Sequence, residues 1–569
     1  MSFQETVRDI DAGTTAKFLK IGMIAAVLAG LCTIYLLGHF KGLDSEEAMD
    51  QAQIARSLLS KEGFSTRYIR PLAIKVLTEE GKPIPNTSFP EIYNAPLFPL
   101  LEAVALLPVK PRLQMAPTDT VSTGDRAIAV LGVVLLFLGV FVWYRVGLFL
   151  FDKTLALLAS GLLFVTDLLW QYALAGLPQL LLIILFGLFT LFALKARQAE
   201  EDDLFVSGRL WLAAAALMLG LMSLTHGVTA FLLPGFLAFS LIAFHTRILS
   251  FLLSLIIYLL TVSPWLIHNY LACHNPLGIS LYLVFAGFDT TTSEVMRGIE
   301  TAFTFGGGLR DKFQRGLIYQ ASHLWEFLGL NLAALVFIPS CLHAFRNPLV
   351  FFWRWFVLAM WLGLIIGLAL FGVKDAVSGN QLHLLFLPIF VLYGTAFLLV
   401  LWNRLNIEGA IFRILFLCAV FLVSAAPMIL TLIVGEPGRI QWPPYVPPFI
   451  SVLNNWYQPQ ELISSDMPWA VAWYANRRCL LIPETVHAFD EISDFNTLGS
   501  PIVGLYLTPI SGSQKFTSLL KGPYKEWAPV IMRTVILNDF LLKSFTALPI
   551  DGECVLYADS ARWARKSTR

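Results

Sequence analysis

Charged residues are scarce in this chain. Only 14% of its 569 residues are Asp, Glu, Lys or Arg, and 57% are hydrophobic, whereas a soluble protein of this size carries about 25% charged residues. The formal net charge is +1, so the composition provides no basic surface for a nucleic acid partner. These values are typical of a polytopic membrane protein.

Motifs of several common enzyme classes are also missing. The six cysteines show no CxxC or Cys/His spacing, so no metal site is predicted. Cys479 and Cys554 share the last segment and could pair. No HExxH, GxSxG, P-loop or GxGxxG pattern occurs. The sequence therefore gives no support to a soluble-type hydrolase or a nucleotide-driven pump.

Apolar runs of about 17–22 residues predict an α-helical membrane protein with about eleven spans. The first run is interpreted as a retained helix, because no cleavage-site pattern follows it. The expected spans are residues 21–38, 127–146, 154–172, 177–194, 210–224, 228–244, 248–267, 327–345, 352–372, 383–402 and 414–434.

Lys and Arg gather in the short loops on one side of these spans, which predicts a cytoplasmic amino terminus. Residues 1–434 then form a transmembrane domain, with two long outward loops at 39–126 and 268–325. We expect an integral protein of a bacterial inner (plasma) membrane, in contact with its lipids.

The tail, residues 435–569, contains no apolar span. Short strand patterns such as "ELISSD", "CLLIP", "PIVGLYLT" and "CVLYAD" alternate with the helical patterns "PWAVAWYANR", "AFDEISDFNT" and "KEWAPVIMRTVI". Such alternation is typical of a partly parallel sheet. We therefore predict a small extracytoplasmic α/β domain.

The stretch "LDSEEAMDQAQIAR", which follows the first span, is rich in acids. A stripe of Ala and Leu at helical spacing predicts a helix that begins near Asp44. Asp44 and Glu47 have the spacing of a capping box, and Glu46 is expected to be a solvated first-turn charge. Asp50 lies past the first turn and projects opposite the stripe, so it faces either an outward cavity or bulk water.

Two arginines and a histidine are candidates for binding phosphate or substrate. Arg67 and Arg70 lie three residues apart and could fork onto phosphate oxygens, although anchoring at lipid headgroups would explain them equally. His383 is the first residue of a predicted span, at the outer membrane edge. It could serve either in packing or in binding.

Four motifs in this order resemble the GT-C superfamily of membrane glycosyltransferases. The similar group is family 39-like, which contains the protein O-mannosyltransferases and the lipid A aminoarabinose transferases. The motifs are "LDSEEAMDQAQIARSLLSKEGF", "NAPLFPL", "SPWLIHNY" and "SSDMPWAVAWYANRRCLLIP".

The resemblance implies transfer of a sugar from a polyprenyl-phosphate donor to a hydroxyl of a protein, lipid or glycan acceptor. It implies inversion at the anomeric carbon, an extracytoplasmic site and a first-loop carboxylate as base, with no cofactor predicted. Two acids compete for the role of base. Alignment of "AQIAR" with the family motif favours Glu47, whereas Asp50 is favoured because it has no capping role. Asp44 ranks below both. The candidates for substrate or phosphate binding are Arg56, Arg67, Arg70 and His383.

The alternative is a transporter or lipid-handling protein without glycosyl transfer. Transporters usually carry charges near the midplane and paired inverted halves. Here the predicted spans carry few charges, and the polar residues lie in the long loops and the tail.

Overall fold

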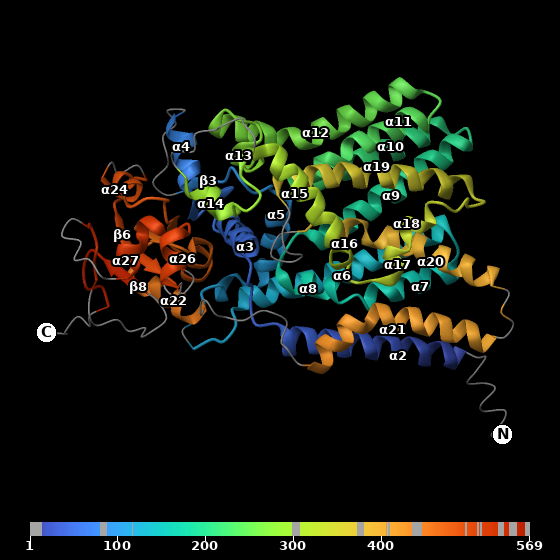
Figure 1. Ribbon diagram of the computed structural model, residues 1–569, viewed down its shortest axis with the longest axis horizontal. Coiled ribbons are helices and arrows are strands. Elements are labelled where there is room, and N and C mark those ends of the chain that lie inside the picture. Colours follow the sequence, from blue (N-terminus) through green and yellow to red (C-terminus); the bar gives the residue numbers. More distant parts are fainter. Residues whose placement is uncertain are drawn as a thin grey trace, which may run out of the picture.

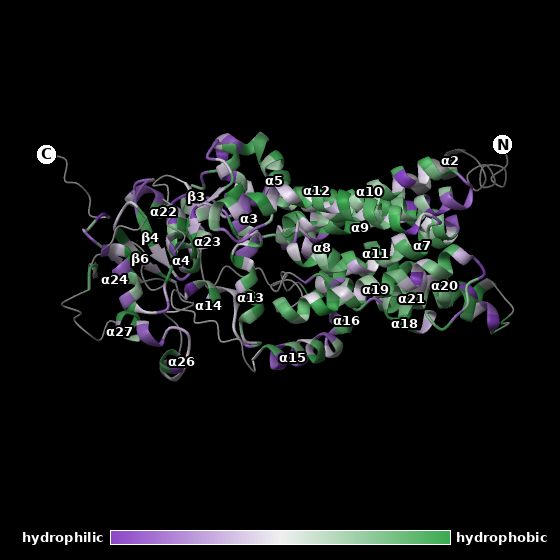
Figure 2. Cartoon of the chain, turned by 90° about the horizontal axis from the view of Figure 1, so that it is seen from above, coloured by the Kyte–Doolittle hydropathy of each residue, from purple (hydrophilic) through white to green (hydrophobic). Residues whose placement is uncertain are grey.

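The computed structural model separates an apolar helical bundle from a mixed α/β end, with the long loops between them (Figure 1). The bundle is predominantly hydrophobic, and hydrophilic residues gather at the α/β end (Figure 2). The structure describes residues 14–79, 88–116, 118–298, 308–372, 381–405, 407, 410–434, 447–494, 498–508, 511, 515–532, 540–544 and 555–563.

Seven of the described helical segments are long and apolar enough to cross a membrane, and a bent pair can provide an eighth span. The pair is α7 (Lys153–Phe164) and α8 (Asp167–Ala175), bent by 59°. The polytopic membrane class is thus confirmed. The seven are α6 (Thr123–Leu150), α9 (Gln179–Glu201), α10 (Phe205–Ser223), α12 (Arg247–Cys273), α19 (Pro348–Phe371), η5 with α20 (His383–Phe386, Leu387–Arg404) and α21 (Ala410–Val434).

Besides the bent pair and the η5–α20 segment, three further predicted spans differ in form from a single regular helix. Residues 21–38 lie in α2 (Thr14–Thr33) and the π-helix η1 (Ile34–His39), and residues 228–244 lie in η3 (Gly227–Leu232) and α11 (Leu233–Ile242). Residues 327–345 break into α16 (Leu324–Phe327), α17 (Leu332–Leu335) and α18 (Phe337–Ser340).

The break before α17 has a local cause. Gly329 and Leu330 both have positive φ, 64° and 54°, which a right-handed helix does not accommodate. Asn331 then caps α17, because its side-chain oxygen accepts from the amides of Ala333 and Ala334. A hydrophobic run long enough to span a membrane is thereby divided into short helices that are only partly buried.

The described parts of the long loops form short elements, most of which lie between the bundle and the tail, while α15 (Gly308–Ser322) packs against α19 of the bundle (Figure 1). The first loop holds α3 (Glu46–Leu59), β1 (Ser65–Thr66), β2 (Tyr68–Ile69), α4 (Pro71–Glu79), β3 (Phe89–Pro90), α5 (Leu97–Leu106) and η2 (Leu107–Arg112). The second holds η4 (Gly278–Leu281), α13 (Tyr282–Phe285), α14 (Thr292–Arg297) and α15.

The tail is the predicted α/β unit, with a six-stranded sheet in the order β2-β5-β4-β6-β8-β7. Strands β2, β5, β4 and β6 are parallel, and β8 and β7 are antiparallel to their neighbours. The tail elements are α22 (Pro447–Trp456), β4 (Leu462–Ser465), α23 (Pro468–Ala470), η6 (Val471–Ala475), β5 (Arg478–Leu481), α24 (Val486–Asp494), β6 (Ile502–Leu507), α26 (Phe516–Lys521), η7 (Lys525–Trp527), α27 (Ala528–Ile531), β7 (Lys543–Ser544) and β8 (Val555–Ala558).

One strand of this sheet comes from the first loop. In β2, Tyr68 pairs with Cys479 and Ile69 with Leu480 of β5, so the sheet crosses the boundary expected at residue 435. The loop and the tail therefore fold as one body around α3. Cys479 is buried with a free thiol, and Cys554 lies outside the described residues.

The contact between α17 and α20 is testable by adding a methyl group. A Cβ at Gly394 would overlap the carbonyl oxygen of Ala333, so Gly394→Ala must push the two helices apart. We expect it to lower the free energy of unfolding by about 1–3 kcal/mol, measured by unfolding in detergent. Gly30→Ala in α2 is the control, since its Cβ meets nothing within 4 Å. Equal stability of the two variants would contradict this packing.

Candidate active site

Helix α3 begins one residue later than the sequence suggested. Ser45 is its N-cap, and the Ser45 hydroxyl accepts from the amide of Ala48 at 3.2 Å. Asp44 is exposed and precedes the cap. The predicted capping box between Asp44 and Glu47 is therefore wrong, because the serine occupies the capping position. Glu47 is left free of a capping role.

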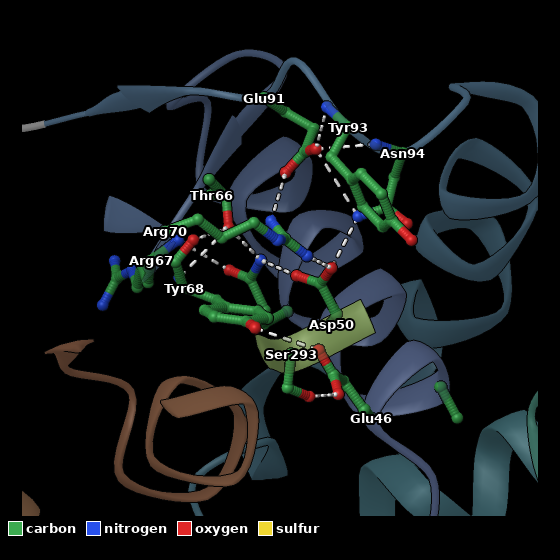
Figure 3. A network of polar contacts seen from close by, with 12 residues as sticks. Glu46, Asp50, Thr66, Arg67, Tyr68, Arg70, Glu91, Tyr93, Asn94 and Ser293 are labelled. Atoms are coloured by element: carbon green, nitrogen blue, oxygen red, sulfur yellow. Dashed lines mark hydrogen bonds and ion pairs between the residues drawn. The ribbon is translucent and has the colours of Figure 1, made fainter. Parts of the chain in front are cut away.

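Asp50 lies in the buried interior between the loop elements. Ten of the fourteen residues of α3 are buried, and Asp50 itself is 1% exposed. Its Oδ2 forms an ion pair with Arg70 Nη2 at 2.5 Å and accepts from Asn94 Nδ2 at 2.6 Å (Figure 3). Gln53 Nε2 donates to its Oδ1 at 3.1 Å. The expectation that Asp50 faces a cavity or bulk water is wrong, since loop residues cover this face of α3.

Arg70 lies beside a second carboxyl group as well. Its Nη1 lies 4.0 Å from Glu91 Oε2, and its guanidinium stacks 4.0 Å from the ring centre of Tyr68 and 4.5 Å from that of Tyr93. Glu91 is fully buried, and its Oε1 accepts from the amides of Tyr93 and Asn94, each at 2.7 Å. Burial, and then the charge of Asp50, raise the pKa of Glu91 to about 7.

Glu46 lies one helical turn before Asp50 and is held by two hydroxyl groups. Tyr68 donates to its Oε1 at 2.9 Å, and Ser293 of α14 donates to its Oε2 at 2.7 Å (Figure 3). Burial raises the pKa of Glu46, while the Ser293 hydrogen bond and the charge of Arg70 oppose the increase. The expectation of a solvated first-turn charge is wrong for this residue.

Glu47 is the acid that these contacts leave available. It is partly exposed, and no side chain in the described ranges donates a hydrogen bond to its carboxylate. Burial, and then the charge of Glu46, raise its pKa to about 8. A carboxyl group with this pKa is mostly protonated at neutral pH, and the ionised fraction that can act as a general base increases as the pH rises through about 8.

The other predicted binding residues have partners elsewhere. Arg56 donates to the carbonyls of Trp473 (2.6 Å) and Leu113 (3.0 Å), and it stacks on the Trp473 ring. Its two donor groups therefore fasten α3 to η6 and to the segment after η2.

Arg67 and His383 are also engaged. Arg67 donates to the carbonyl of Asn476 at 2.7 Å and pairs with Glu62 at 2.6 Å. His383 is buried and hydrogen-bonded to Trp361 Nε1 (3.0 Å) and Gln320 Oε1 (2.9 Å). Arg70 is thus the member of the predicted cations that contacts the acids, and Arg56, Arg67 and His383 have no recorded contact with these carboxylates in the described ranges.

The acids Glu46, Asp50 and Glu91, together with Arg70 and the side chains that bond to them, form one polar cluster. Several members of this cluster could not be identified from the sequence. Glu91 belongs to "EIYNAPLFPL", where its spacing of three from Asn94 allows a local side-chain turn. Gln53 follows Asp50 by three residues on the same helix. Ser293 reaches Glu46 across 247 positions, a contact that local spacing does not predict. In the described ranges, no three His, Cys, Asp or Glu residues are grouped to hold a metal ion.

Comparison with known proteins identifies the fold. No protein-family model and no curated protein matches the sequence. The crystal structure of ArnT from Cupriavidus metallidurans superposes with a TM-score of 0.57 and 11% identity, covering 95% of this chain and 99% of that one. The archaeal oligosaccharyltransferase AglB from Archaeoglobus fulgidus, solved with an inhibitory peptide and a dolichol-phosphate, gives 0.50 and 11%, covering 97% and 75%. The chain therefore has the GT-C fold that its motifs resemble.

The shared ion pair makes a strong stability prediction. Arg70→Met would leave Asp50 and Glu91 buried without a cation, and we expect a loss of about 3–5 kcal/mol in the free energy of unfolding. Unfolding in detergent at neutral pH measures this loss.

Lys75→Met is the matched control for that change. Its ion pair with Glu79 is 23% and 63% exposed, so its removal should cost at most about 1 kcal/mol. Similar losses of unfolding free energy in the two variants would show that Arg70 does not stabilise the buried acids.

Proposed function

We propose that this protein is an integral membrane glycosyltransferase that moves a sugar from a polyprenyl-phosphate donor to an acceptor hydroxyl, with inversion. The observation that carries the proposal is Glu47, a carboxylate without a side-chain partner in the described ranges, whose raised pKa is near 8. It lies beside a fixed acid–arginine cluster in a GT-C fold. The positive-inside pattern favours an extracytoplasmic position for this site.

The chemistry requires few groups from the protein. Glu47 takes the proton of the acceptor hydroxyl as that oxygen attacks the anomeric carbon. The bond from this carbon to the phosphate oxygen breaks, and the polyprenyl phosphate leaves with the electron pair. Because a phosphate is a stable anion, it needs no proton from a general acid, and one base is sufficient.

The contacts also rank the three candidate bases. Asp50 is engaged by three donors, including a buried guanidinium, so proton transfer to it would disrupt the ion pair. Asp44 lies outside the helix and is exposed. Glu47 is therefore the preferred base, and Asp50 is assigned the role of fixing Arg70 and the rotation of α3.

Phosphate binding by Arg56, Arg67, Arg70 and His383 stays a prediction. Among them, Arg70 lies beside the acids, and a donor phosphate would share its guanidinium with Asp50 and Glu91. The proposed partners are the polyprenyl-phosphate sugar, a hydroxyl-bearing protein, lipid or glycan, and the surrounding lipids. The AglB neighbour was solved with a dolichol-phosphate, a ligand of the same chemical class as the proposed donor.

The transporter alternative finds no comparable support. Asp167, an acid in the predicted span 154–172, accepts from Tyr35 at 2.6 Å, from Gln171 at 2.8 Å and from Thr431 at 3.0 Å. These bonds join η1, α8 and α21, so the carboxylate is used to connect helices. Because these hydrogen bonds explain why an acid lies within the bundle, its presence does not require a transport pathway.

Transfer assays on purified protein test the base directly. With a radiolabelled polyprenyl-phosphate sugar and a lipid or peptide acceptor extract, Glu47→Gln should reduce kcat/KM by about 10²–10⁴-fold. In the wild type, kcat/KM should increase with pH and level off above about pH 8, because the base must be deprotonated.

Glu79→Gln makes the same chemical change on the exposed end of α4 and should leave transfer unaltered. Full transfer by Glu47→Gln would remove this residue as the base. Accumulation of substrate in proteoliposomes without a covalent product would favour the transporter.

A further inference from the structure

Helix α14 of the second loop connects the acidic cluster to the tail. At one end, the Ser293 hydroxyl donates to Glu46 Oε2 at 2.7 Å. One turn later, Arg297 points into the tail and is 3% exposed. Residues four apart lie on the same face of a helix, so a single face of α14 contacts both the acids and the α/β unit.

Arg297 is bound by the tail backbone at three points. Its Nε donates to the carbonyl of Ile482 at 2.9 Å, and its Nη2 donates to that of Pro483 at 3.1 Å. Its Nη1 donates to the carbonyl of Pro523 at 2.8 Å, and its guanidinium stacks on Tyr524 at 4.3 Å. The side chain thus joins the end of β5 to the segment before η7.

This docking contributes to the position of Ser293. Helix α14 has only six residues, and helices this short are not stable by themselves in water. Its capping box, formed by Thr291 and Glu294, closes the first turn. The helix packs against α4 and α13, and the Arg297 contacts attach its other end to the tail.

We propose that Ser293 is a positioning residue that acts on Glu47 through Glu46, and that Arg297 sets this contact by docking α14 on the tail. The inference rests on the proposed function, because it takes Glu47 as the base. It assigns the tail a part in the transfer chemistry: the α/β unit orients an acid beside the base through one helix of the second loop.

The physical coupling runs through charge. Ser293 and Tyr68 stabilise the ionised form of Glu46 by donating hydrogen bonds, and the charge of Glu46 raises the pKa of Glu47. Without the Ser293 hydroxyl, Glu46 should retain its proton to higher pH, and Glu47 should then lose its proton at lower pH. The other titratable or charged groups that act on Glu46, or on which it acts, are Asp50, Arg70, Tyr93 and Tyr524.

Opposite shifts of two neighbouring acids are the signature to measure. Carbodiimides modify protonated carboxyl groups, so labelling of the full-length protein across pH, read by peptide mass spectrometry, gives a midpoint for each residue. In Ser293→Ala, the Glu46 midpoint should increase and the Glu47 midpoint should decrease. In Glu46→Gln, the Glu47 midpoint should decrease by about one pH unit, and adding Ser293→Ala should cause no further shift.

Two comparisons separate the hydroxyl from the docking. Ser293→Thr retains the hydroxyl and should restore the wild-type midpoints. Arg297→Met should reproduce the Ser293→Ala shifts, because α14 loses its attachment. Arg315→Met, in the same loop but with ion pairs on the exposed surface, should leave both midpoints unchanged.

Unchanged midpoints in Ser293→Ala, or shifts of both acids in the same direction, would overturn the inference. Normal midpoints in Arg297→Met would overturn the part assigned to the tail. Absence of sugar transfer by the wild type, with the predicted labelling shifts intact, would instead refute the proposed function. The labelling and the transfer assay therefore fail independently.

Discussion

The contact of one guanidinium with two buried carboxyl groups is the constraint on which this site depends. Asp50 and Glu91 are 1% and 0% exposed, and a buried charge without a partner is very costly. Arg70 meets both and is itself enclosed between two tyrosine rings. The loop segments that supply these residues must therefore come together, or none of the three charges can be buried.

The ion pair also fixes the rotation of α3. Glu46 and Asp50 are four residues apart, so pairing Asp50 inward brings Glu46 onto the same face, where Tyr68 and Ser293 bind it. Glu47 follows Glu46 by about 100° around the helix and lies at the edge of this face, partly exposed. The position of the proposed base thus follows from the burial of a different acid.

Much of this architecture is visible in the sequence, because it depends on local patterns. Hydrophobic runs predict most of the spans, and the tail strands follow from short apolar runs that alternate with helical patterns. The failures have physical causes. An apolar run cannot distinguish a span from the short helices of 327–345, and β2 has only two residues, too few to form a recognisable strand pattern. Asp44 and Ser45 are both good N-caps, so the choice between them was not set locally. The burial of Asp50 depends on Arg70 and Asn94, 20 and 44 positions away.

Burial of the acids beside Asp50 opposes folding when these acids are ionised, because it raises the pKa of Glu46, Glu47 and Glu91. The pKa of Glu47 in the folded protein is raised to about 8 from 4.5, so its ionised form opposes folding. The stability contributed by its protonated form is complete below the unfolded pKa and is lost as the pH rises through about 8. The Arg70 cluster supplies the rigidity that lets the fold retain such an acid beside a second one.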